Sequence, residues 1–287
     1  MDQRRVEIFR AVAHAGSMAA AARELGWTQP AVSQHVQALE RQLGAPLVVR
    51  TPRGVRLTEA GAVLLVHADA VAARLRSAEQ ELAALAGLAS GTVRLAAFPS
   101  TAATLLPQAL AALPDGITVL LSEAEPPEAL LAVDGGEVDG ALVFVHPSSP
   151  PLPDQLARTV LLRDPLHLVL PAGSPHDRVD ALAGERWIAG CVRCREQLLQ
   201  LCANAGFVPD LRHSTDDYVV VQALVAAGLG VALLPALALR AYTHPDVTTV
   251  PLRPAAHRDV LLVSHVESTR TPALRALTGA LQHAAGP

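Results

Sequence analysis

The 287-residue sequence contains no lysine, so all 23 basic residues are arginine, and only 3% of its residues are aromatic. It also lacks any run of about eighteen apolar residues, which argues against a membrane-spanning helix. The first ten residues carry five charged side chains and lack the apolar segment of a signal peptide. We therefore expect a cytoplasmic protein without membrane contact, in which the three cysteines are reduced rather than joined in structural disulfides.

Apolar residues make up 51% of the chain, so leucine, valine and alanine are available to fill sizeable cores. The length is typical of about two domains. Charge is distributed unevenly: residues 1–90 carry a net charge of +2, and residues 91–287 carry −6. The overall charge of −4 argues against a nonspecific polyanion binder, but DNA binding requires only a local basic surface.

Residues 17–44 predict two short helices joined by a tight turn. Ser17 can cap the first helix and Gly26 can end it. Thr28 can cap the second helix, which Gly44 ends. Apolar residues of the second helix are spaced four, three and four apart, so one face packs inward; they are Val32, Val36, Leu39 and Leu43. The outward face carries uncharged hydrogen-bonding side chains, with proline in the first turn: Gln29, Pro30, Ser33, Gln34 and Gln37.

Amide and hydroxyl side chains on one helix face are suited to contacting base edges in a DNA major groove. The alternative is an ordinary solvated polar face. The next residues favour DNA binding, because residues 47–58 predict a β-hairpin, or wing, with a turn at 52–54. Arg50, Arg53 and Arg56 lie on or beside the tip of this wing. They can contact phosphates or enter a minor groove.

These residues resemble the LysR-type transcriptional regulators. The matching runs are AAAREL at 20–25, TQPAVSQHV at 28–36 and RTPRGVRLTEAG at 50–61, with the pairs Leu39-Glu40 and Leu43-Gly44 between them. The layout of the whole chain is similar to that of the family. The resemblance implies a sequence-specific DNA-binding transcriptional regulator that a small-molecule effector controls. Its expected partners are double-stranded promoter or operator DNA and the effector, and RNA polymerase is a further candidate.

Residues 59–88 contain no proline and show a seven-residue repeat. Its two interleaved series are Gly61, Ala68, Leu75 and Leu82, and Leu64, Val71, Ala78 and Leu85. Such a repeat is typical of a coiled-coil seam, although a core helix within one domain is the alternative. The resemblance favours a dimerisation linker helix at 59–90, and therefore a homodimer or homotetramer.

Beyond residue 91 predicted strands alternate with helices, which indicates an α/β sheet of parallel strands. The resemblance implies a two-lobed effector domain, similar to periplasmic binding proteins. We place one lobe at about 91–161 plus 266–287 and the other at about 162–265, with crossovers near 161–166 and 259–265. The predicted fold is therefore α/β, with a winged helix-turn-helix at 1–58, a linker helix and hinge at 59–90, and the effector domain at 91–287.

Ligands of such folds bind where strands end. Ser100 and Thr101 follow the first strand and begin a helix, which suits a carboxylate or similar anion, although Ser100 has the alternative role of a simple helix cap. Glu125 follows the second strand and favours a cationic or polar ligand instead. The sequence leaves both ligand types open. The candidate effector-binding residues are Ser100, Thr101, Glu125, Cys191, Val192, Arg193 and Thr215.

Cys191 and Cys194 form a C-x-x-C motif, which Cys202 follows on a predicted apolar helix face. A helix N-terminus lowers the pKa of a thiol, and Arg193 and Arg195 are expected to lower it further. The alternatives are ordinary pocket or packing residues, a thiol-redox switch, or a soft-metal site, but a zinc site would need more ligands. No catalytic residue set, metal site or cofactor is predicted, so a DNA-binding domain fused to an enzyme is a remote alternative.

Overall fold

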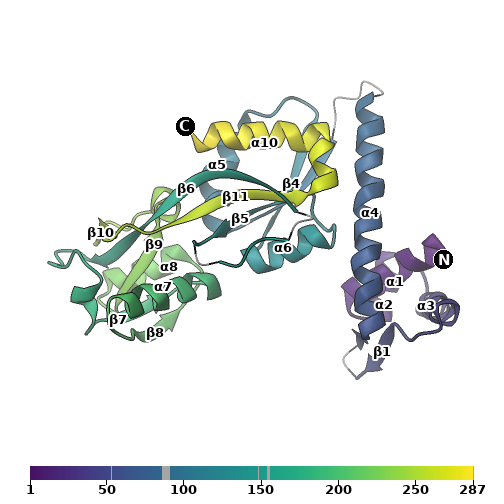
Figure 1. The fold of residues 1–287 in the computed structure, drawn as a ribbon, viewed down its shortest axis with the longest axis horizontal. Helices are drawn as coiled ribbons and strands as arrows, with labels where there is room; N and C mark the ends of the chain where they lie inside the picture. The colour runs from purple at the N-terminus through teal and green to yellow at the C-terminus, as the bar shows by residue number, and fades with distance from the viewer. Residues whose placement is uncertain (53, 86–90, 148, 154–155, 287) are drawn as a thin grey trace.

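The computed structural model describes residues 1–52, 54–85, 91–147, 149–153 and 156–286. At the N-terminus, α1 (Gln3–Ala15), α2 (Met18–Glu24) and α3 (Gln29–Leu43) pack around a small core that includes Val12, Val32 and Val36 (Figure 1). The Ser17 Oγ accepts a hydrogen bond from the Ala20 N–H at 3.0 Å, which confirms the predicted cap of α2. Thr28 occupies the cap position of α3, although its hydroxyl makes no capping bond among the described residues.

The wing consists of β1 (Val48–Thr51) and β2 (Gly54–Leu57), which pair in antiparallel register. It is attached to the helices, because the Val55 N–H donates to the Gly16 carbonyl at 2.9 Å. Gly54 has a φ of +137°, and a Cβ at this position would overlap the Gly16 carbonyl oxygen. The predicted hairpin is therefore present and packs closely on the turn between α1 and α2. Arg53 lies outside the described residues.

The predicted linker is the long helix α4 (Glu59–Leu85), which stands between the N-terminal helices and the C-terminal domain in Figure 1. Its first turns pack on the N-terminal domain, where Leu64 contacts a cluster containing Phe9 and Leu47. Further along, the repeat is exposed: Val71, Leu75 and Leu82 retain 54%, 44% and 66% of their accessible surface. The predicted seam thus divides into a part buried within the chain and an exposed part. The predicted hinge at 89–91 falls mostly outside the described residues.

The C-terminal domain contains a curved mixed sheet with the strand order β4-β3-β5-β11-β6-β9-β7-β8, and β10 pairs with β6. In the first lobe β3, β4 and β5 are parallel, as are β7, β8 and β9 in the second. The first five strands along this domain are β3 (Gly91–Ala97), β4 (Ile117–Glu123), β5 (Gly140–Val145), β6 (Leu156–Pro171) and β7 (Arg186–Ala189). The strands that follow are β8 (Asp210–Ser214), β9 (Val231–Pro235), β10 (Val247–Pro251) and β11 (His257–His265).

The prediction of a purely parallel sheet is wrong, because β6 and β11 run antiparallel to their neighbours. These two strands carry the chain out of the first lobe and back again, so they must run in opposite directions. The crossover predicted near 161–166 lies within β6, a single strand of 16 residues that belongs to both lobes.

Helices cover both faces of the sheet. In the first lobe α5 (Pro99–Ala111) and α10 (Pro272–Ala285) lie on one face, and α6 (Pro126–Asp134) lies on the other (Figure 1). In the second lobe α7 (Val192–Asn204) and α8 (Tyr218–Ala226) cover opposite faces. The short helix α9 (Ala236–Ala241) follows β9, and its Leu237 packs into the core of the first lobe.

Two 3-10 helices complete the secondary structure of the described residues: η1 (Asp180–Leu182) and η2 (Val266–Arg270). Cys202 is fully buried beside Leu198, which confirms its predicted packing role. Across the residues that the structure describes, every helix is too short or too polar to cross a lipid bilayer.

Candidate functional site

The outward face of α3 presents all five side chains that the sequence singled out. Gln29, Pro30, Gln34 and Gln37 are exposed, and Ser33 is half-buried. On the opposite face Val32, Val36 and Leu39 are fully buried. The helix therefore divides into a packed side and a polar side that is largely exposed.

The wing adds positive charge next to this face. Arg50 and Arg56 are exposed. Arg50 pairs with Val55 and Arg56 pairs with Val49, so the two arginines point to different faces of the hairpin. Arg50 Nη2 donates a hydrogen bond to the Ser33 Oγ, which connects the wing to α3. Together α3 and Arg50 form one surface of amides, a hydroxyl and a guanidinium group, which is the chemistry that DNA bases and phosphates bind.

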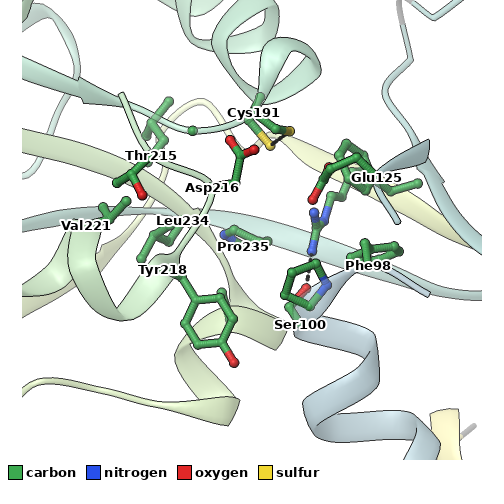
Figure 2. A pocket seen from close by; sticks show the side chains of 17 residues that line it. Phe98, Ser100, Glu125, Cys191, Thr215, Asp216, Tyr218, Val221, Leu234 and Pro235 are labelled. Carbon is green, nitrogen blue, oxygen red and sulfur yellow. Dashed lines mark hydrogen bonds between the residues drawn. The ribbon is translucent and has the colours of Figure 1, made fainter. Parts of the chain in front are cut away.

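A cleft of about 480 Å³, including the part open to solvent, lies between the two lobes (Figure 2). Segments that follow strands β3, β4, β7 and β8 form its walls, together with β9 and β11. Its lining residues are Phe98, Pro99, Ser100, Glu125, Phe144, Gly190, Cys191, Cys194, Thr215, Asp216, Tyr218, Val221, Leu233, Leu234, Pro235, Ala238 and Arg258. The cleft lies where strand ends meet, which is the usual ligand position in open α/β folds.

Four of the seven predicted effector residues line this cleft: Ser100, Glu125, Cys191 and Thr215. Thr101 points into the core instead, where it is fully buried and its Oγ1 donates to the Phe98 carbonyl at 2.9 Å. Val192 is 72% exposed and Arg193 is half-buried, and both lie outside the cleft lining. The reason is helical geometry, because consecutive residues of α5 and α7 point about 100° apart and cannot all face the same cavity.

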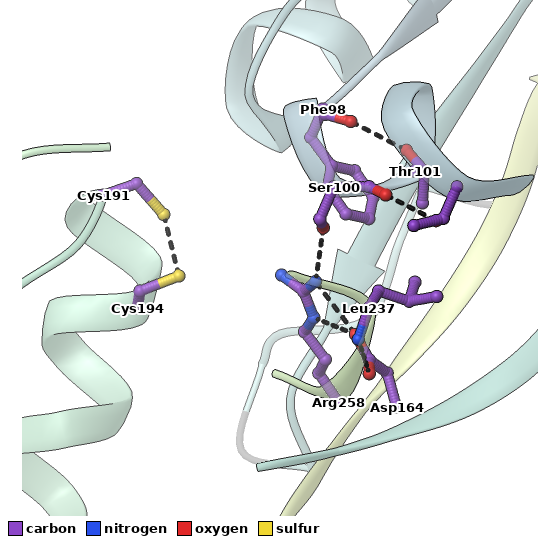
Figure 3. A network of polar contacts seen from close by, with 9 residues as sticks. Phe98, Ser100, Thr101, Asp164, Cys191, Cys194, Leu237 and Arg258 are labelled. Atoms are coloured by element: carbon purple, nitrogen blue, oxygen red, sulfur yellow. Dashed lines mark hydrogen bonds and ion pairs between the residues drawn. The ribbon is translucent and has the colours of Figure 1, made fainter. Parts of the chain in front are cut away.

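Arg258, which sequence reasoning missed, is the central polar residue of the cleft (Figure 3). It is only 3% exposed. Its Nε donates to Asp164 Oδ2 at 2.9 Å, and its Nη2 donates to the Ser100 Oγ at 2.9 Å. The Arg258 Cζ also lies 4.4 Å from the ring centre of Phe144 and 4.9 Å from that of Phe98. The available signal was a charged residue at the start of an apolar strand, since a buried arginine needs a partner.

The same network connects the two lobes. Asp164 lies on β6 opposite Arg258 on β11, and it is 1% exposed. Its Oδ1 accepts a hydrogen bond from the Leu237 N–H of α9 at 3.0 Å. Ser100 lies in the first turn of α5. Arg258 and Asp164 therefore join both crossover strands to α5 and α9 at the floor of the cleft.

Glu125 precedes α6 and carries a carboxyl group that the protein only partly satisfies. Its Oε2 is buried and has no hydrogen-bond partner within the described chain. Burial raises the pKa of Glu125, the Cys191 thiol opposes this shift, and the negative charge of Asp216 adds to it. A carboxyl group with an unsatisfied oxygen beside a cavity is suited to binding a ligand that donates hydrogen bonds.

The two cleft cysteines form a pair, with Cys191 Sγ 3.0 Å from Cys194 Sγ (Figure 3). The hydrogen bond from Cys191 lowers the pKa of the Cys194 thiol, and the charge of Arg258 lowers it further. The pKa of Cys191 is raised by its bond to Cys194 and by burial. The expected lowering is therefore wrong for Cys191, and Arg258 rather than Arg193 or Arg195 is the cation that affects the pair. Among the described residues no group of three or more histidine, cysteine and acidic side chains could hold a metal ion.

A second polar cluster joins the N-terminal domain, α4 and the first lobe. Asp69 of α4 is buried and forms an ion pair with Arg10 of α1. His14 Nε2 lies 2.8 Å from Asp69 Oδ1, and His14 Nδ1 lies 2.8 Å from Glu137 Oε1, just before β5. The hydrogen bond with Asp69 raises the pKa of His14, despite opposition from burial, and the charges of Asp69 and Glu137 reinforce the shift.

Comparisons with known proteins agree with this architecture. The family model described as "Bacterial regulatory helix-turn-helix protein, lysR family" matches residues 3–62, and "LysR substrate binding domain" matches residues 86–286. The chain is 30% identical to the HTH-type transcriptional regulator CbbR of Sinorhizobium medicae, over 95% of this chain and 90% of that protein.

Solved structures share the fold. A full-length OxyR variant from Pseudomonas aeruginosa superposes with a TM-score of 0.75 at 21% identity, covering 98% of this chain and 95% of that one. Full-length CbnR in complex with its target DNA gives a TM-score of 0.64 at 24% identity, covering 99% of this chain and all of the other.

A winged helix-turn-helix, a long linker helix and a two-lobed domain with a cleft define the class of effector-controlled DNA-binding regulators. The chain belongs to the LysR family of transcriptional regulators. It combines a DNA-binding domain with an effector-binding domain, and the relatives favour this function over the thiol-redox or metal-responsive alternative.

Proposed function

We propose that the outward face of α3 contacts base edges in the major groove while the wing contacts the DNA backbone or minor groove. The observation that supports this proposal is the hydrogen bond from Arg50 to Ser33, because it joins a guanidinium group of the wing to the polar face of α3. Gln29, Ser33 and Gln34 then supply sequence discrimination, and Arg50 and Arg56 supply affinity.

We further propose that a small molecule binds in the cleft and shifts the balance between two arrangements of the lobes. A ligand changes such a balance only by the difference in its affinity for the two states. The cleft meets this requirement, because its lining comes from both lobes and a bound molecule would contact them together. The protein would act by binding alone, without catalysis, in the cytoplasm, with RNA polymerase as a candidate partner at the promoter.

The exposed part of the α4 repeat supports pairing with a second chain. Val71, Leu75 and Leu82 form an exposed apolar stripe on α4. Pairing two such helices would bury this stripe and would place two copies of α3 on adjacent half-sites. A homodimer, or a tetramer built from two such dimers, is therefore the proposed assembly.

The test measures binding of the full chain to the DNA upstream of its own gene over a range of salt concentrations. Arg56→Ala should weaken binding to all sequences and reduce the salt slope by about one, because one phosphate contact is lost. Ser33→Ala should instead reduce discrimination between operator and unrelated DNA. Arg178→Ala, which removes an exposed arginine from the second lobe, is the matched control and should change neither quantity. Unchanged affinity and slope in Arg56→Ala would contradict the assignment of the wing.

A further inference from the structure

Two acidic side chains, one from each lobe, line the cleft. Glu125 belongs to the first lobe, and Asp216 belongs to the loop between β8 and α8 of the second lobe. Figure 2 shows these two side chains on facing sides of the cleft, with Asp216 beside the cysteine pair. The negative charge of Asp216 reaches Glu125, since it contributes to the raised pKa of that carboxyl group. Two carboxyl groups from different lobes therefore oppose each other across the cavity.

Arg258 is the cation that acts on this pair, since its charge opposes the raised pKa of Glu125, but its ion pair is with Asp164. Neither Glu125 nor Asp216 forms an ion pair within the described residues, and the Glu125 Oε2 has no hydrogen-bond partner there. A primary ammonium group carries three N–H donors and a positive charge, so it can bond both carboxyl groups at once. Such a group would satisfy the buried Glu125 Oε2 and would remove the repulsion between the lobes.

The floor of the cleft, close to Glu125, offers donors for an anion. Arg258 uses Nε and Nη2 in its bonds to Asp164 and Ser100, which leaves Nη1 without a partner in the described chain. The Ser100 hydroxyl accepts from Arg258, so its own hydrogen remains available to donate. A carboxylate can accept from both groups. Because Arg258 is 97% buried and its guanidinium group contacts two phenylalanine rings, this site is organised before a ligand arrives.

Apolar side chains line another part of the cleft wall. Val221, Leu234 and Pro235 form part of this wall, with the Tyr218 ring next to them. A dicarboxylic acid would bring a second negative charge towards Glu125 and Asp216. A simple amine would leave the donors of Ser100 and Arg258 unused.

Resting on the proposed function as an effector-controlled regulator, we propose that the effector is an α-amino acid with an apolar side chain. Its carboxylate accepts hydrogen bonds from Ser100 and Arg258, and its ammonium group bridges Glu125 and Asp216. Because the two carboxyl groups belong to different lobes, the ammonium group holds the lobes together. The side chain lies against Val221 and Leu234.

The experiment titrates the full chain by calorimetry with each of the twenty standard L-amino acids. At least one apolar amino acid should bind. For each amino acid that binds, the matched carboxylic acid without the amine and the matched amine without the carboxylate should bind at least about tenfold more weakly, because each loses one charged set of hydrogen bonds. Absence of binding by every apolar amino acid would overturn the proposal, and so would equal binding by the acid that lacks the amine.

Single substitutions test which side chains contact the bound amino acid. Glu125→Gln and Asp216→Asn should each weaken binding by about tenfold to a hundredfold. Glu128→Gln, an exposed change one turn further along α6, is the control and should leave affinity unchanged. Equal affinity in Glu125→Gln and the control would overturn the role of the carboxyl pair. Operator binding is measured on the same preparations. If the unmodified chain binds the operator but no amino acid, only this inference is refuted. If the unmodified chain does not bind the operator, the proposed function is refuted.

Discussion

The polar face of α3 and the cleft between the lobes are organised in opposite ways. The face comes from one continuous helix, and its side chains are largely exposed, with a single bond from Arg50 to Ser33. The cleft draws on segments from Phe98 to Arg258, and its central arginine and aspartate are almost fully buried. Substitutions on the face should therefore change binding with little effect on stability, whereas substitutions at the floor of the cleft should change the stability of the domain itself.

The largest effect is expected for Arg258→Ala. The substitution leaves the carboxylate of Asp164, which is 1% exposed, without its cationic partner. Breaking a buried ion pair by removing one partner typically costs about 3–5 kcal/mol. Urea unfolding of the effector domain measures the loss. Arg163→Ala, an exposed neighbour on β6 with a loose 3.6 Å pair to Asp259, should cost less than about 1 kcal/mol. Similar losses for both variants would remove the distinction between the cleft floor and the surface.

An intermediate effect is expected at His14, which lies between the DNA-binding domain and the first lobe. The pKa of His14 is raised above its ordinary value of 6.5 in the folded protein. Its contribution to stability is then fully present below pH 6.5 and is lost as the pH rises through the raised pKa. Unfolding curves between pH 5.5 and 8.5 should show His14→Gln less stable than the unmodified chain at the acid end only.

The control for this effect is His67→Gln, because His67 is exposed on α4, two residues before Asp69. It should follow the unmodified chain at every pH. Glu137→Gln should reduce the acid-side difference in part, since the bond of His14 to Asp69 remains. A difference between His14→Gln and the unmodified chain that persists unchanged to pH 8.5 would show that the ring acts by packing and not by charge.

The smallest effect on stability is expected for Gln34→Ala. Gln34 is exposed on α3, and a surface substitution of this kind usually changes the free energy of unfolding by less than about 0.5 kcal/mol. Discrimination between operator and unrelated DNA should nevertheless fall, because an amide that bonds a base edge is lost. Thermal unfolding and competition binding on the same sample measure the two quantities. A large loss of stability would place Gln34 in a structural role and would weaken the contrast between the two regions.

Much of the fold was predictable where a local pattern carries the information. The caps and apolar spacings predicted α2 and α3, and the seven-residue repeat predicted α4. The alternation of strands and helices predicted the α/β domain, but not the antiparallel β6 and β11, because strand direction depends on how the chain passes between lobes. Of the expected effector residues, Thr101 and Val192 follow the right strands yet point away from the cleft, since their direction depends on helix rotation.

By itself, the sequence determined the elements that short-range periodicity encodes: the two-helix unit with its polar outward face, the wing with its arginines, and the repeat of the linker helix. Only the tertiary structure decided which distant groups meet. Arg258 bonds Asp164, 94 residues away, and Ser100, 158 residues away, and no local pattern links these positions. Burial then determined their chemistry, because the pKa values of Glu125, Cys191 and Cys194 depend on the neighbours and the low dielectric that folding supplies.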